Sequence, residues 1–84
     1  MKNGMSILIA NSPNAMSLWF ENDKIYFLLE DGRELGVPID WFPKLVNATE
    51  AELNNWRLIG GGDGVHWPDL DEDISVEGLL VAGH

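Results

Sequence analysis

Three apolar runs joined by short polar links constrain the fold of this chain more than any other feature. The runs are MSLWFE (16–21), KIYFLLE (24–30) and RELGVPI (33–39). They are rich in aromatic and β-branched residues, which favour strands, and links this short join antiparallel neighbours. The pattern predicts a three-stranded antiparallel meander. Asp31-Gly32 is expected to form a type I′ turn, which needs positive φ at both central positions. Pro38 has no N–H for a ladder, so it should end the third strand or lie on an open edge.

Residues 40–48 (DWFPKLVNA) predict a short helix after the meander. Asp40 is its expected cap, and Pro43 falls in the first turn, where a missing N–H costs little. The side chains expected to face the sheet are Trp41, Leu45 and Phe42.

The rest of the chain adds two helices and one strand to this expectation. Thr49 with Glu52 forms a capping-box pattern and predicts a second helix. Residues 56–60 (WRLIG) predict a fourth strand, and residues 75–80 (SVEGLL) a final helix capped by Ser75. The expected buried face of the second helix is Ala51, Leu53 and Trp56. The order β-β-β-α-α-β-α predicts an α+β fold with the meander packed against short helices.

The length of 84 residues suits a single domain with a thin core. Residues 1–15 are expected to be an N-terminal extension, and residues 16–84 one compact α+β domain. Within the extension, Ser6–Ala10 either pairs at a sheet edge or is a weakly ordered tail. No cysteine is present, which excludes disulfides, zinc–thiolate sites and cysteine nucleophiles. No signal-peptide pattern or membrane-length apolar run is visible, so we expect a cytoplasmic protein with no membrane contact.

The net charge of −9 is distributed unevenly. Residues 1–46 carry four Lys or Arg and six Asp or Glu, which gives −2, whereas residues 47–84 carry Arg57 and eight acids, which gives −7. Direct binding to nucleic acid requires a basic footprint, which this chain lacks. A basic protein would be attracted instead, although such charge also serves as a solubilising surface.

Residues 60–78 (GGGDGVHWPDLDEDISVEG) invite comparison with ligand-binding loops. A phosphate-binding P-loop needs a lysine and a following hydroxyl, and neither stands in the glycine run. Asp69, Asp71 and Asp73 match the first, third and fifth places of a calcium-binding EF-hand loop. Ile74 takes the place of the required glycine, and Leu80 that of the bidentate glutamate. We therefore predict no metal and no cofactor.

The same stretch is explained better as architecture. Glycines 60–64 can reverse the chain after the fourth strand, and Trp67 offers a large apolar body for burial. His66 could pair with Asp63 or Asp69 as a general base, but no compelling nucleophile accompanies it. A histidine between Val and Trp more often bonds a loop backbone, so catalysis through His66 is the less favoured reading.

One feature of the stretch is left unexplained by architecture, namely its density of acids. We expect these acids to form an exposed ridge that steers a basic protein partner, with Trp41 or Phe42 as an apolar anchor if either is exposed. The ridge residues are Asp69, Asp71, Glu72 and Asp73.

Several ordered motifs connect the two halves of the chain. In sequence order they are Asp31-Gly32-Arg33, Val37-Pro38, Trp41-Phe42-Pro43, His66-Trp67-Pro68 and Leu70-Asp71-Glu72-Asp73-Ile74. With these motifs, residues 16–80 resemble the small bacterial protein family labelled domain of unknown function 2442. The resemblance implies a compact α+β domain of bacterial or phage origin and no established activity. It also implies genomic pairing with a second small protein, as in toxin–antitoxin systems, and some relatives carry an appended helix-turn-helix domain.

Three functions remain open at this point. The first is a non-catalytic protein-interaction module, such as the acidic, antitoxin-like member of a two-protein system. The second is an enzyme that uses His66 with a nearby aspartate. The third is an accessory part of a transcription regulator that acts through a separate DNA-binding partner. The sequence is also compatible with a homo-oligomer.

Overall fold

The computed structural model describes residues 13–82, which form two antiparallel three-stranded sheets and short helices. The α+β class predicted from the sequence is confirmed. The strand-capable run Ser6–Ala10 lies outside the described residues. No helix in residues 13–82 is long and apolar enough to cross a membrane.

The first sheet is the predicted meander, in the order β1 (Ala15–Glu21), β2 (Lys24–Leu29) and β3 (Glu34–Pro38). The prediction of a type I′ turn at Asp31-Gly32 was wrong. The loop there has four residues, and only Gly32 among them has positive φ (92°). Asn22 and Asp23 carry φ of 54° and 63° instead, and they close the two-residue link between β1 and β2. Pro38 ends β3, as expected.

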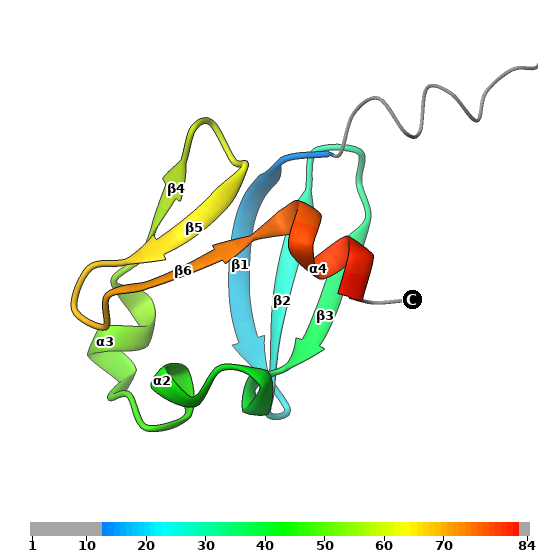
Figure 1. Cartoon of the computed structure of the whole chain (residues 1–84). Coiled ribbons are helices and arrows are strands. Elements are labelled where there is room, and N and C mark those ends of the chain that lie inside the picture. The colour runs from blue at the N-terminus through cyan, green and yellow to red at the C-terminus, as the bar shows by residue number, and fades with distance from the viewer. Residues whose placement is uncertain (1–12, 83–84) are drawn as a thin grey trace, which may run out of the picture.

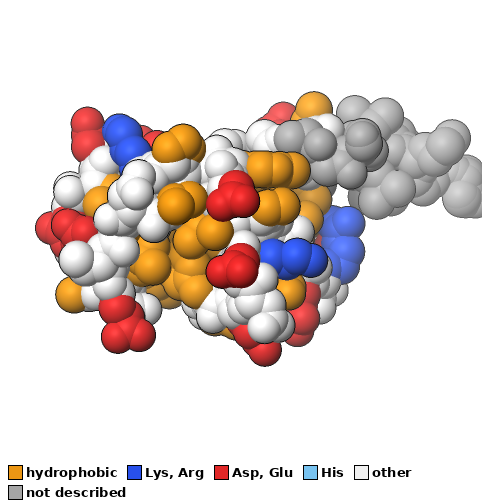
Figure 2. Space-filling model, turned by 90° about the horizontal axis from the view of Figure 1, so that it is seen from below, with side chains coloured by type: hydrophobic (Ala, Val, Ile, Leu, Met, Phe, Trp, Pro, Cys, Tyr) orange, Lys and Arg blue, Asp and Glu red, His pale blue; other side chains and the backbone are white. Residues whose placement is uncertain are grey.

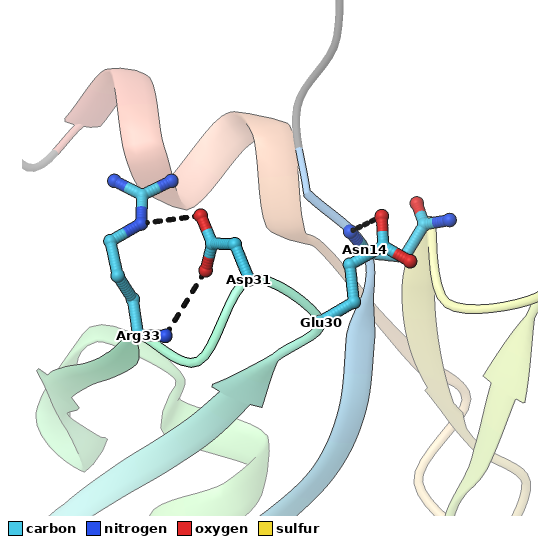
Figure 3. Close-up of polar contacts among 4 residues, drawn as sticks. All are labelled: Asn14, Glu30, Asp31 and Arg33. Atoms are coloured by element: carbon cyan, nitrogen blue, oxygen red, sulfur yellow. Dashed lines mark hydrogen bonds and ion pairs between the residues drawn. The ribbon is translucent and has the colours of Figure 1, made fainter.

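The loop between β2 and β3 is held by local polar contacts (Figure 3). The Asp31 carboxylate accepts hydrogen bonds from the backbone N–H of Arg33 at 3.1 Å and from its Nε at 2.8 Å. The backbone N–H of Arg33, together with its guanidinium, holds the pKa of Asp31 below its ordinary value. Nearby, the Glu30 side chain accepts from the Asn14 backbone N–H at 3.1 Å, which ties the start of the described chain to this loop.

The two faces of the first sheet differ. Alternate residues such as Ile25 and Phe27 are buried in the core. On the other face Trp19 stacks on Tyr26, with ring centroids 5.4 Å apart, and Tyr26 lies over Gly36 of β3. A Cβ on Gly36 would stand 2.6 Å from the Tyr26 ring, so glycine is what lets the ring lie flat there.

The helix predicted over residues 40–48 is instead two shorter pieces, η1 (Ile39–Trp41) and α2 (Pro43–Val46). Phe42 separates them, with φ of −128° and ψ of 87°. A residue before proline is pushed out of the helical region, which is why Pro43 starts a new helix. Asp40 therefore lies inside η1 and caps nothing, so its predicted role was wrong.

The side chains of this segment differ in how deeply they are buried. Leu45 is fully buried and Phe42 is half-buried against the core, as expected. Trp41 is 48% exposed, so the prediction that it faces the sheet was wrong. The reason is the break at Phe42, which turns η1 away from the direction that one continuous helix would have given its first residues.

Helix α3 (Glu50–Asn54) begins with the predicted capping box. Thr49 Oγ1 accepts from the Glu52 N–H at 3.1 Å, and the Glu52 carboxylate accepts from the Thr49 N–H at 2.8 Å. Leu53 packs on the core, and so does Trp56, two residues after the helix. Ala51 is exposed, contrary to expectation, because a helix this short presents only a narrow face to the core.

The second sheet has the order β4 (Arg57–Ile59), β5 (Gly64–Trp67) and β6 (Glu72–Ser75). Only β4 was predicted. Helix α4 (Val76–Ala82) follows β6 directly, and Ser75 caps it as expected, since its Oγ accepts from the Gly78 N–H at 3.1 Å.

The two sheets share one core. Figure 1 shows β6 passing across β1 and leading into α4, which is drawn over β2 and β3. The sheets also meet through backbone, where the Ala15 N–H donates to the Gly62 carbonyl at 2.8 Å. The largest fully buried side chains come from both sheets and from the helices: Trp67, Phe27, Ile25, Leu29, Leu45, Val65 and Val76.

Candidate functional site

The acidic residues predicted to form one ridge lie around the turn from β5 to β6, and they face different ways. Asp69 and Asp71 are exposed in the turn itself. The Asp69 carboxylate accepts from Asn55 Nδ2 at 2.9 Å, which ties the turn to the end of α3. Asp71 has φ of 52°, a left-handed conformation that aspartate tolerates better than most residues.

Strand β6 then separates the other two acids. Glu72 pairs with Trp67, and Asp73 pairs with His66, so their side chains leave opposite faces of the sheet. Glu72 is half-buried, whereas Asp73 is exposed. The four carboxylates therefore do not form a single continuous ridge.

The acidic turn is joined to the helices beside it. Lys44 Nζ of α2 donates to the Asp71 carbonyl at 3.0 Å. Within three residues of Lys44 along the chain, Trp41 is 48% exposed and Val46 is 47% exposed. Two apolar side chains thus lie in the segment that Lys44 ties to the acidic turn. The lower face of the molecule in Figure 2 shows hydrophobic side chains gathered near its middle, with acidic side chains on several sides.

His66 is half-buried in the central strand of the second sheet, and its Nδ1 contacts the Asp73 carboxylate. The expected partners, Asp63 and Asp69, were wrong. Pairing across the sheet decides this contact, because Arg57, His66 and Asp73 stand opposite one another on β4, β5 and β6. The contact holds the ring of His66 at Nδ1.

A shallow hollow lies next to this pair, with a volume of about 200 Å³. Its lining residues are Ile59, Asp63, Gly64, Asp73, Ile74 and Ser75. The hydroxyl of Ser75 accepts the capping bond of α4, so its acceptor function serves the fold. The arrangement places the imidazole of His66 against the carboxylate of Asp73 beside this hollow.

Trp67 is fully buried, and its indole N–H donates to the Leu53 carbonyl at 3.0 Å. The predicted burial of this residue is confirmed. In the part of the chain that the structure describes, no three His, Asp or Glu side chains are grouped so that they could hold a metal ion.

Comparison with known proteins places the chain among proteins of unknown function. A crystal structure of a protein of unknown function from Rhodospirillum rubrum has a TM-score of 0.73 and 28% identity, over 86% of this chain and 89% of that one. A solution structure of an uncharacterised protein from Chromobacterium violaceum has a TM-score of 0.72 and 29% identity, over 93% of this chain and 73% of that one. The comparison with curated proteins gave no match.

The family model described as "Protein of unknown function (DUF2442)" matches residues 15–84, which begin with the first residue of β1. This span includes both sheets and every helix described above. The chain therefore belongs to the DUF2442 family.

Proposed function

We propose that this protein is a non-catalytic interaction module that binds a basic protein partner. The proposed contact area, named here the Trp41–Asp71 surface, consists of Trp41, Val46, Asp69 and Asp71. The observation that carries the proposal is the exposure of a tryptophan in the segment that Lys44 ties to the acidic turn. Glu72 and Phe42, also expected at the interface, are half-buried and would contribute only at its margin.

The two kinds of side chain would act differently in binding. A half-exposed tryptophan offers a large apolar area, and tryptophan is among the residues most often found to dominate binding energy. The carboxylates would attract a basic partner over a longer range and raise the association rate. A net charge of −9 strengthens this attraction and disfavours acidic competitors. The charge fits a cytoplasmic two-protein system in which an acidic chain neutralises a basic one.

The test requires the partner, obtained by co-purification from the native host and identified by mass spectrometry. Association and dissociation rates are then measured at low and high salt. Asp69→Asn/Asp71→Asn should slow association about threefold to tenfold at low salt and much less at high salt, because salt screens exposed charges. The matched control is Glu34→Gln/Glu77→Gln, which removes the same charge from β3 and α4.

Trp41→Ala in the same experiment should weaken binding at least about tenfold, mainly through faster dissociation. Val81→Ala removes an exposed apolar side chain from α4 and serves as its control. If both variants of the Trp41–Asp71 surface bind like their controls, the surface is not the interface and the proposal fails.

A second candidate function is supported by the contact between His66 and Asp73. An aspartate that holds Nδ1 fixes the tautomer and leaves Nε2 to act as a general base toward water or a substrate. A suitable assay follows hydrolysis of p-nitrophenyl acetate by the wild type, His66→Gln and Asp73→Asn. A catalytic pair requires that both variants lose rate. A wild-type rate no higher than that of free imidazole at equal concentration would exclude this candidate.

A further inference from the structure

A groove of about 320 Å³ lies between strand β1 and the end of helix α3. Figure 1 shows β1 as the strand of the first sheet nearest to α3. Its lining residues are five apolar ones, Leu18, Trp19, Phe20, Leu53 and Trp56, and two polar ones, Glu50 and Asn54. Its volume falls at the lower end of the range of ligand-binding sites.

Strand β1 is an edge strand, and its pairing shows which backbone groups face outward. Glu21 and Lys24 flank the two-residue turn and so form a hydrogen-bonded pair. Hydrogen-bonded and non-hydrogen-bonded pairs alternate along an antiparallel ladder. Leu18 and Phe20, opposite Phe27 and Ile25, therefore direct their N–H and C=O groups away from β2, toward the free edge.

These groups have no backbone partner among residues 13–82. The backbone bond that β1 makes there outside its own sheet is the one from Ala15 to Gly62. Edge strands with unpaired N–H and C=O groups are ready to pair with a further strand. Leu18 and Phe20 carry such unpaired groups, and both residues also line the groove.

We infer that β1 binds an extended segment of a partner protein as an added strand over Leu18–Phe20. Backbone hydrogen bonds would provide the affinity, and the groove would select the side chains. Alternate side chains of the added strand would lie on the same face as Leu18 and Phe20 and pack against Leu53 and Trp56. This site goes beyond the Trp41–Asp71 surface, shares no residue with it, and stands or fails independently of it.

The charges define the chemistry of the segment. Glu50 lines the groove, Glu21 ends the strand, and no lysine or arginine is among the lining residues. A segment of alternating apolar and basic residues is therefore complementary. A second copy of this chain is not, because two molecules of charge −9 would repel each other.

The other end of the edge is closed. The Ala15 N–H donates to the Gly62 carbonyl, and Gly62 packs against the Ala15 backbone and the Asn14 Cβ. An added strand is therefore restricted to the half of β1 that leads to Asn22.

Amide hydrogen exchange tests the free edge first. The N–H groups of Leu18 and Phe20 should exchange at least about tenfold faster than that of Trp19, which is in the ladder with β2. Equal protection at all three positions would overturn the assignment of a free edge.

Binding is then tested by NMR with a capped peptide, KVKVKVK, at about 1 mM. We expect shifts at the Leu18 and Phe20 amides and the Trp56 indole, together with slower exchange at the two amides. The peptide KPKPKPK has the same charge but cannot pair as a strand, and it should produce none of these effects. Equal effects from both peptides, or no effect from KVKVKVK, would refute strand addition.

Two variants test the role of charge. Glu50→Lys should weaken KVKVKVK binding about fivefold, whereas Glu77→Lys on α4 should leave it nearly unchanged. Equal weakening by both would mean that net charge, not the groove, attracts the peptide. The oligomeric state of the free protein is then measured by sedimentation. If the protein is a dimer and the Leu18 and Phe20 amides are protected in it, a second copy of this chain occupies the edge, and the assignment to a partner segment is wrong.

Discussion

Replacing Trp67 by alanine should lower the free energy of unfolding by about 3–5 kcal/mol, the range for large-to-small changes at buried aromatic residues. Trp67 is fully buried, and its indole N–H donates a hydrogen bond to the Leu53 carbonyl. A domain of 84 residues has about 4–12 kcal/mol of stability in total. Urea denaturation followed by circular dichroism should therefore show a variant that is close to unfolding at room temperature.

Two further variants separate the contribution of the indole hydrogen bond from that of the buried apolar side chain. Trp67→Phe keeps much of the apolar volume but leaves the Leu53 carbonyl without its donor, and it should cost about 1–3 kcal/mol. Trp41→Ala removes the same side chain from an exposed position and should cost less than either. If Trp67→Ala keeps the denaturation midpoint of the wild type, the architectural role of Trp67 is wrong.

The second large effect is expected for Gly62→Ala. Gly62 has φ of 120°, and a Cβ there would collide with the Ala15 carbonyl and lie 2.8 Å from the Asn14 Cβ. The unfavourable backbone conformation costs about 1–2 kcal/mol, and the collision adds about 1–3 kcal/mol. The substitution should also separate the Ala15 N–H from the Gly62 carbonyl.

Gly61→Ala is the matched control. Gly61 has φ of 74°, but nothing lies within 4 Å of the Cβ position, so only the conformational cost of about 1–2 kcal/mol applies. The difference in unfolding free energy between the two variants measures the contact between the β4–β5 turn and β1. Equal losses for Gly61→Ala and Gly62→Ala would show that this contact contributes nothing.

The elements that could be predicted are those with strong local signals. Short links between β-prone runs gave the meander, and Thr49 with Glu52 gave the start of α3. In both cases the decisive interaction lies within a few residues of chain, where sequence spacing determines geometry.

The second sheet was predicted only in part because its strands lack such signals. β5 begins with Gly64, and β6 begins with two acids, residues that are rare in strands. These segments become strands through pairing with β4 and with each other, and through burial of Val65, Trp67 and Ile74. Tertiary context thus overrides weak local preference.

The candidate sites show the same limit. The nearness of Asp63 and Asp69 in sequence suggested partners for His66, yet register across the sheet selected Asp73, seven residues away. The exposure of Trp41 depends on the conformation of Phe42, which a single-helix prediction did not include. The groove beside β1 combines residues 18–20 with residues 50–56, and no spacing within either segment indicates it.

The strand order has a consequence for how the chain folds. In both sheets every strand pairs with its neighbour in sequence, so each pairing closes only a short loop of chain. Short loops lose little entropy on closure, and chains with such connections fold quickly for their class. The slower event should be the meeting of the two finished meanders, which brings Gly62 to Ala15 and closes the shared core around Trp67. Substitutions at that junction should then alter the folding rate more than substitutions within either hairpin.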